Sequence, residues 1–389
     1  MSTSIWFQTL DEAQCRLLEE SDPLPRTAEI AVVGAGLIGL AAAYYLSAGG
    51  ASGLCVLDRR AGLAEASGAN AGGLWFAQQS PELGPLIPLA QASSRMYEEL
   101  ATEGGFDFGY RRPGLVELLP GEREWGEAEG VLAAVRRAGF RAARIDQAQL
   151  QGLEPALSHG PAGAIFYPEE GQLHPARLGA AWVRRLKHKN VRFCFGAEVR
   201  RLRPRIETSL GTLDAGVVLL AAGAWTPLVS RTLGWTPPIR PMRGQLLVTP
   251  PLPPLLRHTV IGRRYYYWQL PEGPVGGGGT VEDVGFERGV NPQDLARIRE
   301  EMDALFPQLS GAPTACAWSG FRPYCEDLKP VIGRCPGEEN LYVAAGHFKK
   351  GVMLAPVTGK ILADLILTGR TDLPIQAFNP ARFSAVATP

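Results

Sequence analysis

Three glycines near the start of the chain, Gly34, Gly36 and Gly39, have the spacing of a turn that binds the diphosphate of a dinucleotide. Gly34 permits a tight turn, Gly36 lets the backbone approach a pyrophosphate, and Gly39 lets a helix pack closely on a strand. Because this glycine spacing alone is not specific for a dinucleotide site, the elements on either side of it have to be considered. Residues 28–33 predict a buried strand before it, and residues 40–47 predict a helix after it, whose N-terminal end favours phosphates.

A carboxylate follows the next predicted strand. Residues 54–57 are a second apolar run, and Asp58 comes directly after it. An acid at this place accepts hydrogen bonds from ribose hydroxyls and repels a 2′-phosphate, which disfavours NADP. Leu37 and Ile38, inside the glycine turn, belong to the same predicted site. Strand, glycines, helix, strand and acid together predict a dinucleotide-binding unit rather than a turn without a ligand.

The uncharged stretch 30–46 could instead be compared with a membrane span. It is shorter than the roughly 20 residues that a span needs. Its glycines and its change of period midway favour a strand, a turn and a helix, so we predict no transmembrane segment.

The composition excludes several classes of function. Lys+Arg and Asp+Glu both number 39 among 389 residues, and a net charge of zero gives no support to nucleic-acid binding. The six cysteines form no Cys-x-x-Cys pair, so no metal site is predicted, and they are too sparse for a disulfide scaffold. The start of the chain lacks the basic and apolar regions of a secretory signal, which favours the cytoplasm.

The rest of the chain predicts further elements in an alternating order. Helices are predicted at 96–103, 122–138, 177–187, 292–305 and 355–367, strands at 114–119, 191–199, 217–222, 244–248, 264–270, 275–279 and 341–345, and a hairpin element at 210–214. A nucleotide-domain pattern thus returns after an inserted segment.

Four segments beyond the glycine turn carry a family resemblance. They are Asp58-Arg59-Arg60 with the small residues 66–73, then 214–225 ending Ala-Ala-Gly-Ala-Trp, 318–333 containing Ser-Gly-Phe-Arg-Pro, and 346–359 beginning Gly-His-Phe-Lys-Lys-Gly. Their types and order resemble the D-amino-acid oxidase and glycine oxidase superfamily of FAD-dependent amine oxidoreductases, and the resemblance covers residues 28–367.

The resemblance implies an α/β (α+β) fold, in which a Rossmann-type FAD-binding domain is joined to a second, mostly antiparallel β substrate domain. We assign residues 27–80, 156–236 and 318–375 to a discontinuous FAD-binding domain. Residues 81–155 and 237–317 are assigned to the substrate-binding domain.

The resemblance also implies that FAD is the cofactor, with the positive N-terminal end of the last helix directed at the flavin. We predict noncovalent FAD, because Cys316 and Cys325 lie near the segment to which some relatives attach the flavin but neither aligns with it. Besides the residues of the glycine turn and Asp58, the predicted cofactor-binding residues are Arg59, Ser67, Asn70, Ala71, Gly72, Gly73, Val199, Ala222, Gly223, Trp225, Gly346, His347, Phe348, Lys349, Gly351 and Val352.

Arg322 is the predicted substrate-binding residue. By resemblance, the arginine of Ser-Gly-Phe-Arg-Pro binds the substrate carboxylate, and its planar guanidinium can do so with two parallel hydrogen bonds. A structural salt bridge is the alternative. Tyr266 is the predicted active-site tyrosine, with Tyr267 as the alternative, and since side chains alternate across a strand only one of the two should face the pocket.

Lys349 is the third predicted catalytic residue, although glycine oxidases usually have arginine there, and Lys350 replaces an asparagine. A lysine is a point charge, so Lys349 either attracts a carboxylate, aids oxygen reduction or forms an ion pair elsewhere. His347 is expected to be structural or flavin-adjacent rather than a general base. Arg243-Gly244-Gln245 resembles a segment that enters the family's substrate sheet.

The activity that the resemblance implies is oxidation of a small amino acid or amine of the glycine, sarcosine or D-amino-acid type. The unprotonated amine would lie over the flavin and pass a hydride to its N5 atom, and oxygen would reoxidise the flavin with formation of hydrogen peroxide. One alternative is a dehydrogenase, for example of proline or sarcosine, that uses another electron acceptor. The other is a flavin redox subunit that requires a partner, and a homo-oligomer is possible.

Overall fold

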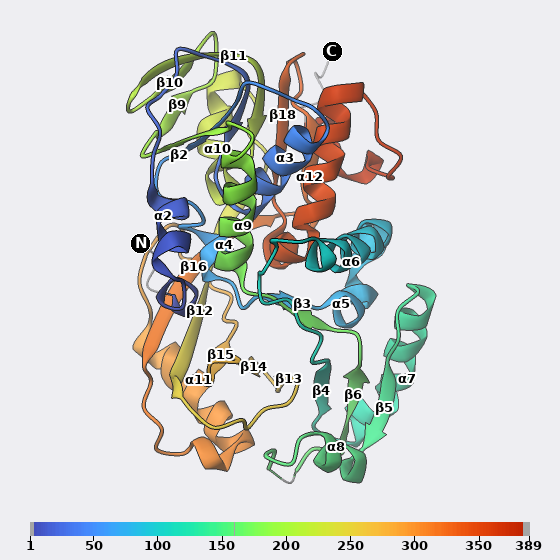
Figure 1. The fold of residues 1–389 in the computed structure, drawn as a ribbon. Coiled ribbons are helices and arrows are strands. Elements are labelled where there is room, and N and C mark those ends of the chain that lie inside the picture. The colour runs from blue at the N-terminus through green and yellow to red at the C-terminus, as the bar shows by residue number, and fades with distance from the viewer. Residues whose placement is uncertain (1–3, 159, 384–389) are drawn as a thin grey trace.

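The structure is a computed structural model that describes residues 4–158 and 160–383 (Figure 1). Two eight-stranded sheets lie one above the other in the view of Figure 1, and a two-stranded sheet of β3 (Gly73–Leu74) and β7 (Gly171–Gln172) lies between them. The α-helices are α1 (Ile5–Gln8), α2 (Glu12–Glu19), α3 (Leu37–Ala48), α4 (Ala66–Ala69), α5 (Phe76–Leu83), α6 (Ile87–Thr102), α7 (Glu122–Arg137), α8 (Gln147–Leu153), α9 (Pro175–Lys187), α10 (Thr226–Ser230), α11 (Pro292–Leu305) and α12 (Gly351–Thr368).

The first sheet is the predicted Rossmann-type sheet. Its order is β17 (Val331–Arg334), β18 (Leu341–Ala345), β11 (Gly211–Leu220), β1 (Thr27–Val33), β2 (Leu54–Asp58) and β8 (Arg192–Phe195), extended by β10 (Ile206–Thr208) and β9 (Val199–Arg201). Strands β18, β11, β1, β2 and β8 are parallel. The chain leaves β1 for β2 on one side and later places β11 on the other, so a crevice opens at the carboxyl ends of these strands.

Glycines let α3 pack closely on its neighbours, as the sequence predicted for Gly39. A Cβ atom at Gly39 would lie 1.9 Å from the carbonyl oxygen of Gly34, so no larger residue fits. A Cβ atom at Gly359 of α12 would lie 2.5 Å from the carbonyl carbon of Ala41 in α3. The two helices therefore approach backbone to backbone over one face of the first sheet.

The second sheet is antiparallel except where β13 pairs with β4. Its order is β16 (Cys316–Cys325), β12 (Ile239–Pro251), β15 (Pro274–Gly278), β14 (Tyr266–Gln269), β13 (Thr259–Ile261), β4 (Leu115–Leu119), β6 (Gly163–Tyr167) and β5 (Ala143–Asp146). Strands β6 and β16 belong to this sheet, although the boundaries drawn from the sequence give residues 156–236 and 318–375 to the other domain. The division into two domains remains a proposal.

Several predicted elements differ in extent from those observed. The helix predicted at 96–103 is only the C-terminal half of α6, and α12 begins four residues before 355. The strand predicted at 191–199 is two strands, β8 and β9, because the chain turns at Gly196, which has a φ of +81°. The hairpin element at 210–214 and the strand at 217–222 are one continuous strand, β11.

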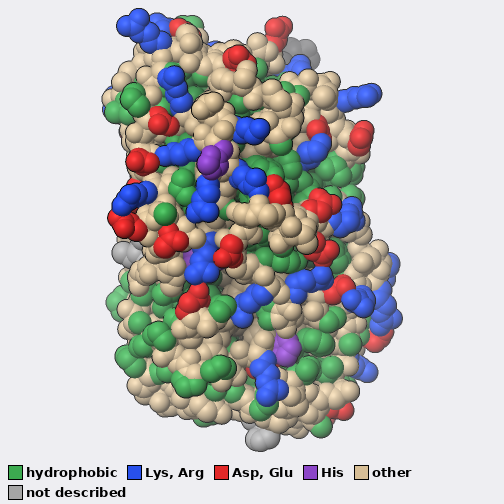
Figure 2. All heavy atoms as spheres, viewed as in Figure 1, with side chains coloured by type: hydrophobic (Ala, Val, Ile, Leu, Met, Phe, Trp, Pro, Cys, Tyr) green, Lys and Arg blue, Asp and Glu red, His purple; other side chains and the backbone are tan. Residues whose placement is uncertain are grey.

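The stretch 30–46 consists of β1, the glycine turn and most of α3, as predicted. Among the described residues, one helical segment, Phe348–Thr368, is long and apolar enough to cross a membrane, with a mean hydropathy of 1.5. Of that window 61% is buried, because α12 packs between α3 and α6, so its apolar character suits the core. On the face in Figure 2, basic and acidic side chains are interspersed, in keeping with a net charge of zero.

Candidate cofactor and substrate site

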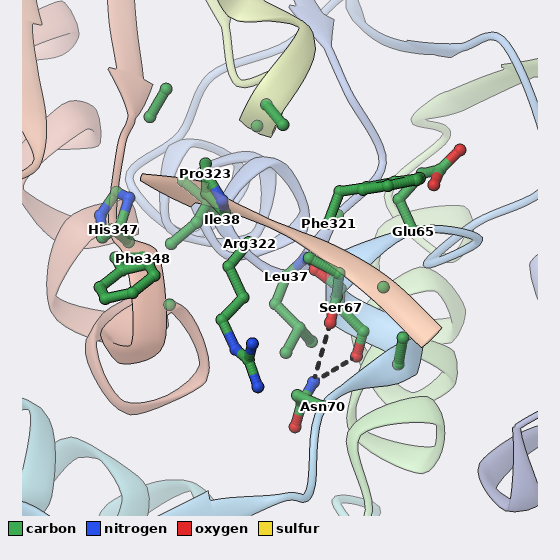
Figure 3. A pocket seen from close by; sticks show the side chains of 18 of the residues that line it. Leu37, Ile38, Glu65, Ser67, Asn70, Phe321, Arg322, Pro323, His347 and Phe348 are labelled. Carbon is green, nitrogen blue, oxygen red and sulfur yellow. Dashed lines mark hydrogen bonds between the residues drawn. The ribbon is translucent and has the colours of Figure 1, made fainter. Parts of the chain in front are cut away.

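An elongated cavity of about 740 Å³ opens at the carboxyl ends of the parallel strands and reaches the second sheet (Figure 3). We call the part around Gly34, Asp58 and Trp225 the nucleotide side, and the part around Tyr266 and Arg322 the substrate side. The volume lies within the range of small-molecule and cofactor sites, which is roughly 300–1,000 Å³.

The glycine turn lines the nucleotide side. Gly34 has a φ of +116°, and a Cβ atom there would lie 2.3 Å from the carbonyl oxygen of Ala221, so this position requires glycine. A Cβ atom at Gly36 would meet only the side chain of Ser67, with its Oγ atom at 3.0 Å. The Ser67 hydroxyl accepts a hydrogen bond from the Leu37 N–H at 2.9 Å. A side chain at Gly36 would crowd Ser67, and because Gly36 lines the cavity without one, a ligand can approach its backbone closely.

Asp58 lies at the end of β2, as predicted, and lines the same part of the cavity. Its Oδ2 atom accepts a hydrogen bond from the Ala35 N–H at 2.8 Å, and its Oδ1 atom accepts one from the Arg60 N–H at 2.9 Å. Burial raises the pKa of Asp58 to about 6, despite these hydrogen bonds to the ionised form. Asp58 thus holds the glycine turn in shape, a role that the sequence analysis missed.

The segment 66–73 is fastened by Asn70. Its Nδ2 atom donates to the Ser67 carbonyl at 2.6 Å (Figure 3), and its Oδ1 atom accepts from the Gly72 N–H at 2.7 Å. The Trp6 indole N–H donates to the Asn70 carbonyl at 2.6 Å, so the N-terminal helix α1, which the sequence did not predict, braces this segment. The side chain of Asn70 therefore shapes the cavity wall.

Trp225 and Arg59 form a stacked pair at the nucleotide side. The Arg59 guanidinium carbon lies 3.9 Å above the Trp225 ring, and Arg59 also pairs with Glu65 at 2.6 Å. Phe286, from the second sheet's side of the cavity, stacks on Trp225 with ring centroids 4.6 Å apart, and Arg288 pairs with Glu65 at 2.8 Å. Glu65 lines the cavity but was missed, since nothing in the local sequence marks it.

The segment before α12 forms the opposite wall, with His347 and Phe348 facing the cavity (Figure 3). The Nε2 atom of His347 lies 3.1 Å from the Thr358 hydroxyl, and burial lowers the pKa of His347 to about 3. A neutral, hydrogen-bonded imidazole agrees with the structural or flavin-adjacent role that was expected. Gly351 and Val352 also line the cavity, so the positive N-terminal end of α12 lies at its wall.

Three predicted cofactor-binding residues do not line the cavity: Gly39, Gly72 and Gly346. Gly39 serves helix packing, as described above. Gly72 has a φ of +71°, and a Cβ atom there would lie 2.1 Å from the Leu173 carbonyl oxygen. Gly346 has a φ of +76° and turns the chain after β18. The remaining predicted residues, Val199, Ala222 and Gly223 among them, do line it.

Arg322 of β16 extends into the substrate side (Figure 3). Its Nη1 atom donates to the Thr280 carbonyl at 2.6 Å. Tyr266 lines the same part of the cavity, and the charge of Arg322 opposes the rise that burial causes in the pKa of Tyr266. A Cβ atom at Gly244 would lie 1.9 Å from that Nη1 atom, so glycine leaves the room for the guanidinium. No carboxylate among the described residues lies at ion-pair distance from Arg322. Within that part of the chain, Arg322 therefore forms no structural salt bridge, which was the alternative to substrate binding.

The tyrosines separate as the alternation of a strand requires. Tyr266 lines the cavity, with the Trp75 ring edge-on at a centroid distance of 4.7 Å. Tyr267 faces the core of the second sheet, where its hydroxyl donates to the Ile298 carbonyl at 3.4 Å. The preference for Tyr266 over Tyr267 at the cavity is therefore correct.

Two lysines lie at the start of α12. Lys349 lines the cavity with its Nζ atom 5.5 Å from the Phe348 ring, and its pKa is lowered chiefly by burial and next by the charge of Arg322. Lys350, 7% exposed, also lines the cavity, and burial lowers its pKa. Within the described part of the chain neither lysine has a carboxylate partner at ion-pair distance, so the substrate side is electropositive.

Helix α5 supplies a polar wall that the sequence analysis did not foresee. Gln78, Gln79 and Glu82 line the cavity. Beneath this helix, the buried carboxylate of Glu170 accepts hydrogen bonds at 2.8 Å from the backbone N–H groups of Phe76 and Gln78. Burial raises the pKa of Glu170 to about 8. A carboxylate distant in sequence thereby anchors the first turn of the helix.

Comparison with known proteins identifies the family. The family model of FAD dependent oxidoreductases (DAO) matches residues 29–365, so the chain belongs to that family. It is similar to the hydrogen cyanide synthase subunit HcnC of Pseudomonas aeruginosa, with 28% identity over 92% of this chain and 97% of that protein. It is also similar to the glycine oxidase of Geobacillus kaustophilus, with 28% identity over 91% of this chain and 97% of that protein.

The crystal structure of the Geobacillus kaustophilus glycine oxidase has the same fold, with a TM-score of 0.87 and 27% identity over 92% of this chain and 99% of that one. The L-proline dehydrogenase of P. horikoshii shares the fold, with a TM-score of 0.82 and 23% identity over 92% of this chain and 98% of that one. The protein is thus an FAD-dependent oxidoreductase of the class that acts on CH–NH2 or CH–NH bonds, as the sequence predicted.

The residues present fit FAD. The open backbone at Gly36, the carboxylate of Asp58 and the N-terminal ends of α3 and α12 all face one continuous cavity. Backbone N–H groups and helix N-termini suit a diphosphate and the electron-rich side of a flavin, which supports the predicted places of the two.

Proposed function

We propose that this enzyme oxidises a small amino acid or secondary amine, of the glycine, sarcosine or D-amino-acid type, to the imine. The observation that carries the proposal is the environment of Arg322, a half-buried guanidinium at the cavity that has no carboxylate partner among the described residues. A substrate carboxylate supplies the missing counter-ion through two parallel hydrogen bonds. This role of Arg322, like those of Tyr266 and Lys349, is part of the proposal.

The residues of the substrate side position the amino acid. Arg322 binds its carboxylate, and the rings of Tyr266 and Trp75 bound the small volume left for its side chain. When bound, FAD supplies the two-electron acceptor for the hydride from the α-carbon. Burial lowers the pKa of His347 to about 3, which makes it a weak base at neutral pH. The amine therefore loses its proton to solvent before it enters the site.

Lys349 and Lys350 add positive charge close to Arg322. This charge favours an anionic substrate and stabilises negative charge that develops at the start of α12. We propose that Lys349 serves the first purpose, since its charge interacts with that of Arg322 across the cavity.

We further propose that oxygen is the electron acceptor, with hydrogen peroxide as the second product. The support is the similarity to glycine oxidases over more than nine-tenths of both chains. The similarity to a protein named as a subunit, HcnC, supports a second candidate, a flavin subunit that passes electrons to a partner. A dehydrogenase with another acceptor is the third.

Anaerobic mixing of the FAD-loaded protein with glycine, sarcosine, proline and D-amino acids, followed at the flavin absorption band, tests the proposal. Bleaching by one of them establishes amine oxidation and identifies the substrate. Bleaching followed by slow peroxide formation and fast dye reduction would point to a dehydrogenase. Retained colour with every compound would contradict the proposed substrates and favour a subunit that needs its partner.

We propose that FAD is held noncovalently, since neither Cys316 nor Cys325 is among the residues that line the cavity. Colour that stays with the chain after denaturation would refute this. We also propose that the enzyme works in the reducing cytoplasm, since its six cysteines are too sparse for a disulfide scaffold.

A further inference from the structure

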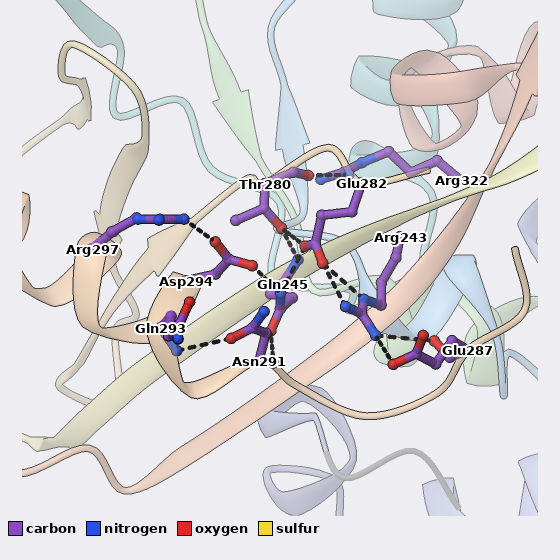
Figure 4. Close-up of polar contacts among 10 residues, drawn as sticks. All are labelled: Arg243, Gln245, Thr280, Glu282, Glu287, Asn291, Gln293, Asp294, Arg297 and Arg322. Atoms are coloured by element: carbon purple, nitrogen blue, oxygen red, sulfur yellow. Dashed lines mark hydrogen bonds and ion pairs between the residues drawn. The ribbon is translucent and has the colours of Figure 1, made fainter. Parts of the chain in front are cut away.

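The segment Arg243-Gly244-Gln245, on β12, lies beside Arg322, but the side chains of Arg243 and Gln245 have no part in the site described so far. Its side chains alternate across the strand. Gly244 leaves space for the guanidinium of Arg322, whereas Arg243 and Gln245 both reach Glu282 in the segment that follows β15 (Figure 4). Glu282 therefore joins two side chains that lie across β12 from the guanidinium of Arg322.

Glu282 is the centre of a compact network (Figure 4). Its Oε2 atom accepts hydrogen bonds from Nη2 and Nε of Arg243 at 2.6 and 2.9 Å, and its Oε1 atom accepts one from Nε2 of Gln245 at 2.7 Å. The side chain of Arg243 is only 6% exposed and that of Glu282 16%. Burial raises the pKa of Glu282, but the hydrogen bonds from Thr280, Gln245 and Arg243 outweigh that effect and hold it below its ordinary value.

Thr280 connects this network to the cavity. Its hydroxyl donates to Oε1 of Glu282 at 2.5 Å and accepts from the backbone N–H of Gln245 at 2.8 Å. Its carbonyl oxygen accepts the hydrogen bond from Nη1 of Arg322 at 2.6 Å. The side chain of Thr280 is therefore held in place by Glu282 and Gln245, while its backbone carbonyl accepts the hydrogen bond from the guanidinium of Arg322.

We propose that Thr280, clamped by Glu282 and Gln245, is a positioning residue that sets the orientation of Arg322 for a substrate carboxylate. The inference rests on the proposed function, in which Arg322 binds that carboxylate. With one N–H group fixed on the Thr280 carbonyl, the guanidinium plane is defined, and its other N–H groups are directed to the cavity.

The physical reason is the flexibility of arginine. A free arginine side chain loses considerable rotamer entropy when it is immobilised by a ligand. Here that loss occurs during folding, because the Thr280 carbonyl and the space at Gly244 hold the guanidinium before the substrate arrives. Preorganisation of this kind raises affinity for the carboxylate without adding a contact to it.

Thr280→Val tests the proposal, because valine keeps the shape of the side chain and removes the hydroxyl. Thr280→Ser retains the hydroxyl and serves as the conservative variant. Thr249→Val is the matched control, since Thr249 is buried on β12, the strand of Gln245, and its hydroxyl also makes two hydrogen bonds, to the Pro250 carbonyl at 2.8 Å and from the Val275 N–H at 3.0 Å. Thr249 lines no part of the cavity.

The measurements are the dissociation constants of benzoate and of its neutral analogue benzamide, from perturbation of the flavin spectrum of the holoenzyme. Loss of the clamp in Thr280→Val is expected to weaken benzoate about tenfold, the equivalent of one lost ordinary hydrogen bond or more. Benzamide affinity, FAD content and the limiting rate of flavin reduction stay near those of the parent. Thr280→Ser and Thr249→Val bind benzoate normally.

Equal changes in Thr280→Val and Thr249→Val, or equal losses for benzoate and benzamide, would overturn the proposal, since they would indicate general destabilisation. Should Thr280→Val not fold, Glu282→Gln answers the same question, because Arg243 keeps Glu287 at 3.6 Å as a partner. Arg322→Leu distinguishes failure of the proposed role of Arg322 from failure of the positioning role of Thr280. If it leaves benzoate binding unchanged, the proposed role of Arg322 itself is wrong. If it abolishes binding while Thr280→Val binds benzoate as tightly as the parent, only this inference fails.

Discussion

The nucleotide side and the substrate side of the cavity are built in different ways. The nucleotide side is shaped by backbone, presented by the glycine turn and the start of α3, with Asp58 at the end of the next strand and the stacked pair of Arg59 and Trp225 beside it. The substrate side consists of side chains from β14, β16, α5 and the start of α12. A backbone site is encoded over a few consecutive residues, whereas a side-chain site depends on segments that only the fold brings together.

The substrate side also depends more on buried polar contacts. Arg322 donates a hydrogen bond to the Thr280 carbonyl, and the buried carboxylate of Glu170 accepts hydrogen bonds from the first turn of α5. The nucleotide side has its own support in the bond from the Ala35 N–H to Asp58. We therefore expect substitutions on the two sides to have separable effects, on substrate and on FAD respectively.

The largest effect is expected for Arg322→Leu. Truncating one partner of a hydrogen-bonded charge pair costs about 2–5 kcal/mol, which lowers kcat/KM for an amino acid roughly 30- to 3,000-fold. FAD content should not change. Arg263→Leu, which removes an exposed arginine outside the cavity, is the control and should behave as the parent. Unchanged turnover of amino acids in Arg322→Leu would contradict the separation of the two sides.

Asp58→Asn should weaken FAD binding about tenfold, because the charged acceptor for a ribose hydroxyl and for the Ala35 N–H is lost. With a pKa raised by burial to about 6, Asp58 of the parent becomes protonated as the pH falls through 6, so FAD affinity should fall there too. Fluorescence titration of the apoprotein with FAD at several pH values measures both. A pH dependence that persists in Asp58→Asn would assign it to another group.

Tyr266→Phe and Tyr267→Phe form a matched pair of neighbours on β14. Tyr266→Phe removes a hydroxyl that lines the cavity and interacts electrostatically with Arg322, and it should raise KM about fivefold, as expected for about 1 kcal/mol. Tyr267→Phe should leave KM unchanged and lower only the thermal stability, since its hydroxyl bonds Ile298 in the core. The reverse result would mean that the strand presents the other face to the substrate.

The smallest effect concerns the anchor of α5. The pKa of Glu170 is raised by burial from 4.5 to about 8, so between these values the unfolded chain has already lost a proton that the folded chain retains. Its contribution to stability is complete below the lower value and is lost as the pH rises through 8. The melting temperature of the parent, relative to Glu170→Gln, should therefore decline over this range. A constant difference would show that Glu170 does not titrate there.

Local patterns in the sequence were enough to predict β1, the glycine turn, α3, β2 and Asp58. Each of these features is encoded by residues that are close to it in the sequence. The same reasoning failed at 191–199, where the positive φ of Gly196 divides one predicted strand into β8 and β9. It also missed α1 and α5, which are short and stabilised by contacts far along the chain, such as that of Glu170 with Phe76.

By itself the sequence determined the family, and it predicted the glycine turn as the FAD site, Arg322 as the substrate-binding residue and Tyr266 in preference to Tyr267, since motifs with fixed spacing and the two-residue period of a strand carry that information. Only the tertiary structure decided that Arg322 has no acidic partner among the described residues, that Glu65 and α5 line the cavity, and that Thr280 holds the guanidinium. Those features join residues tens to hundreds of positions apart, and no local pattern encodes which of them will meet.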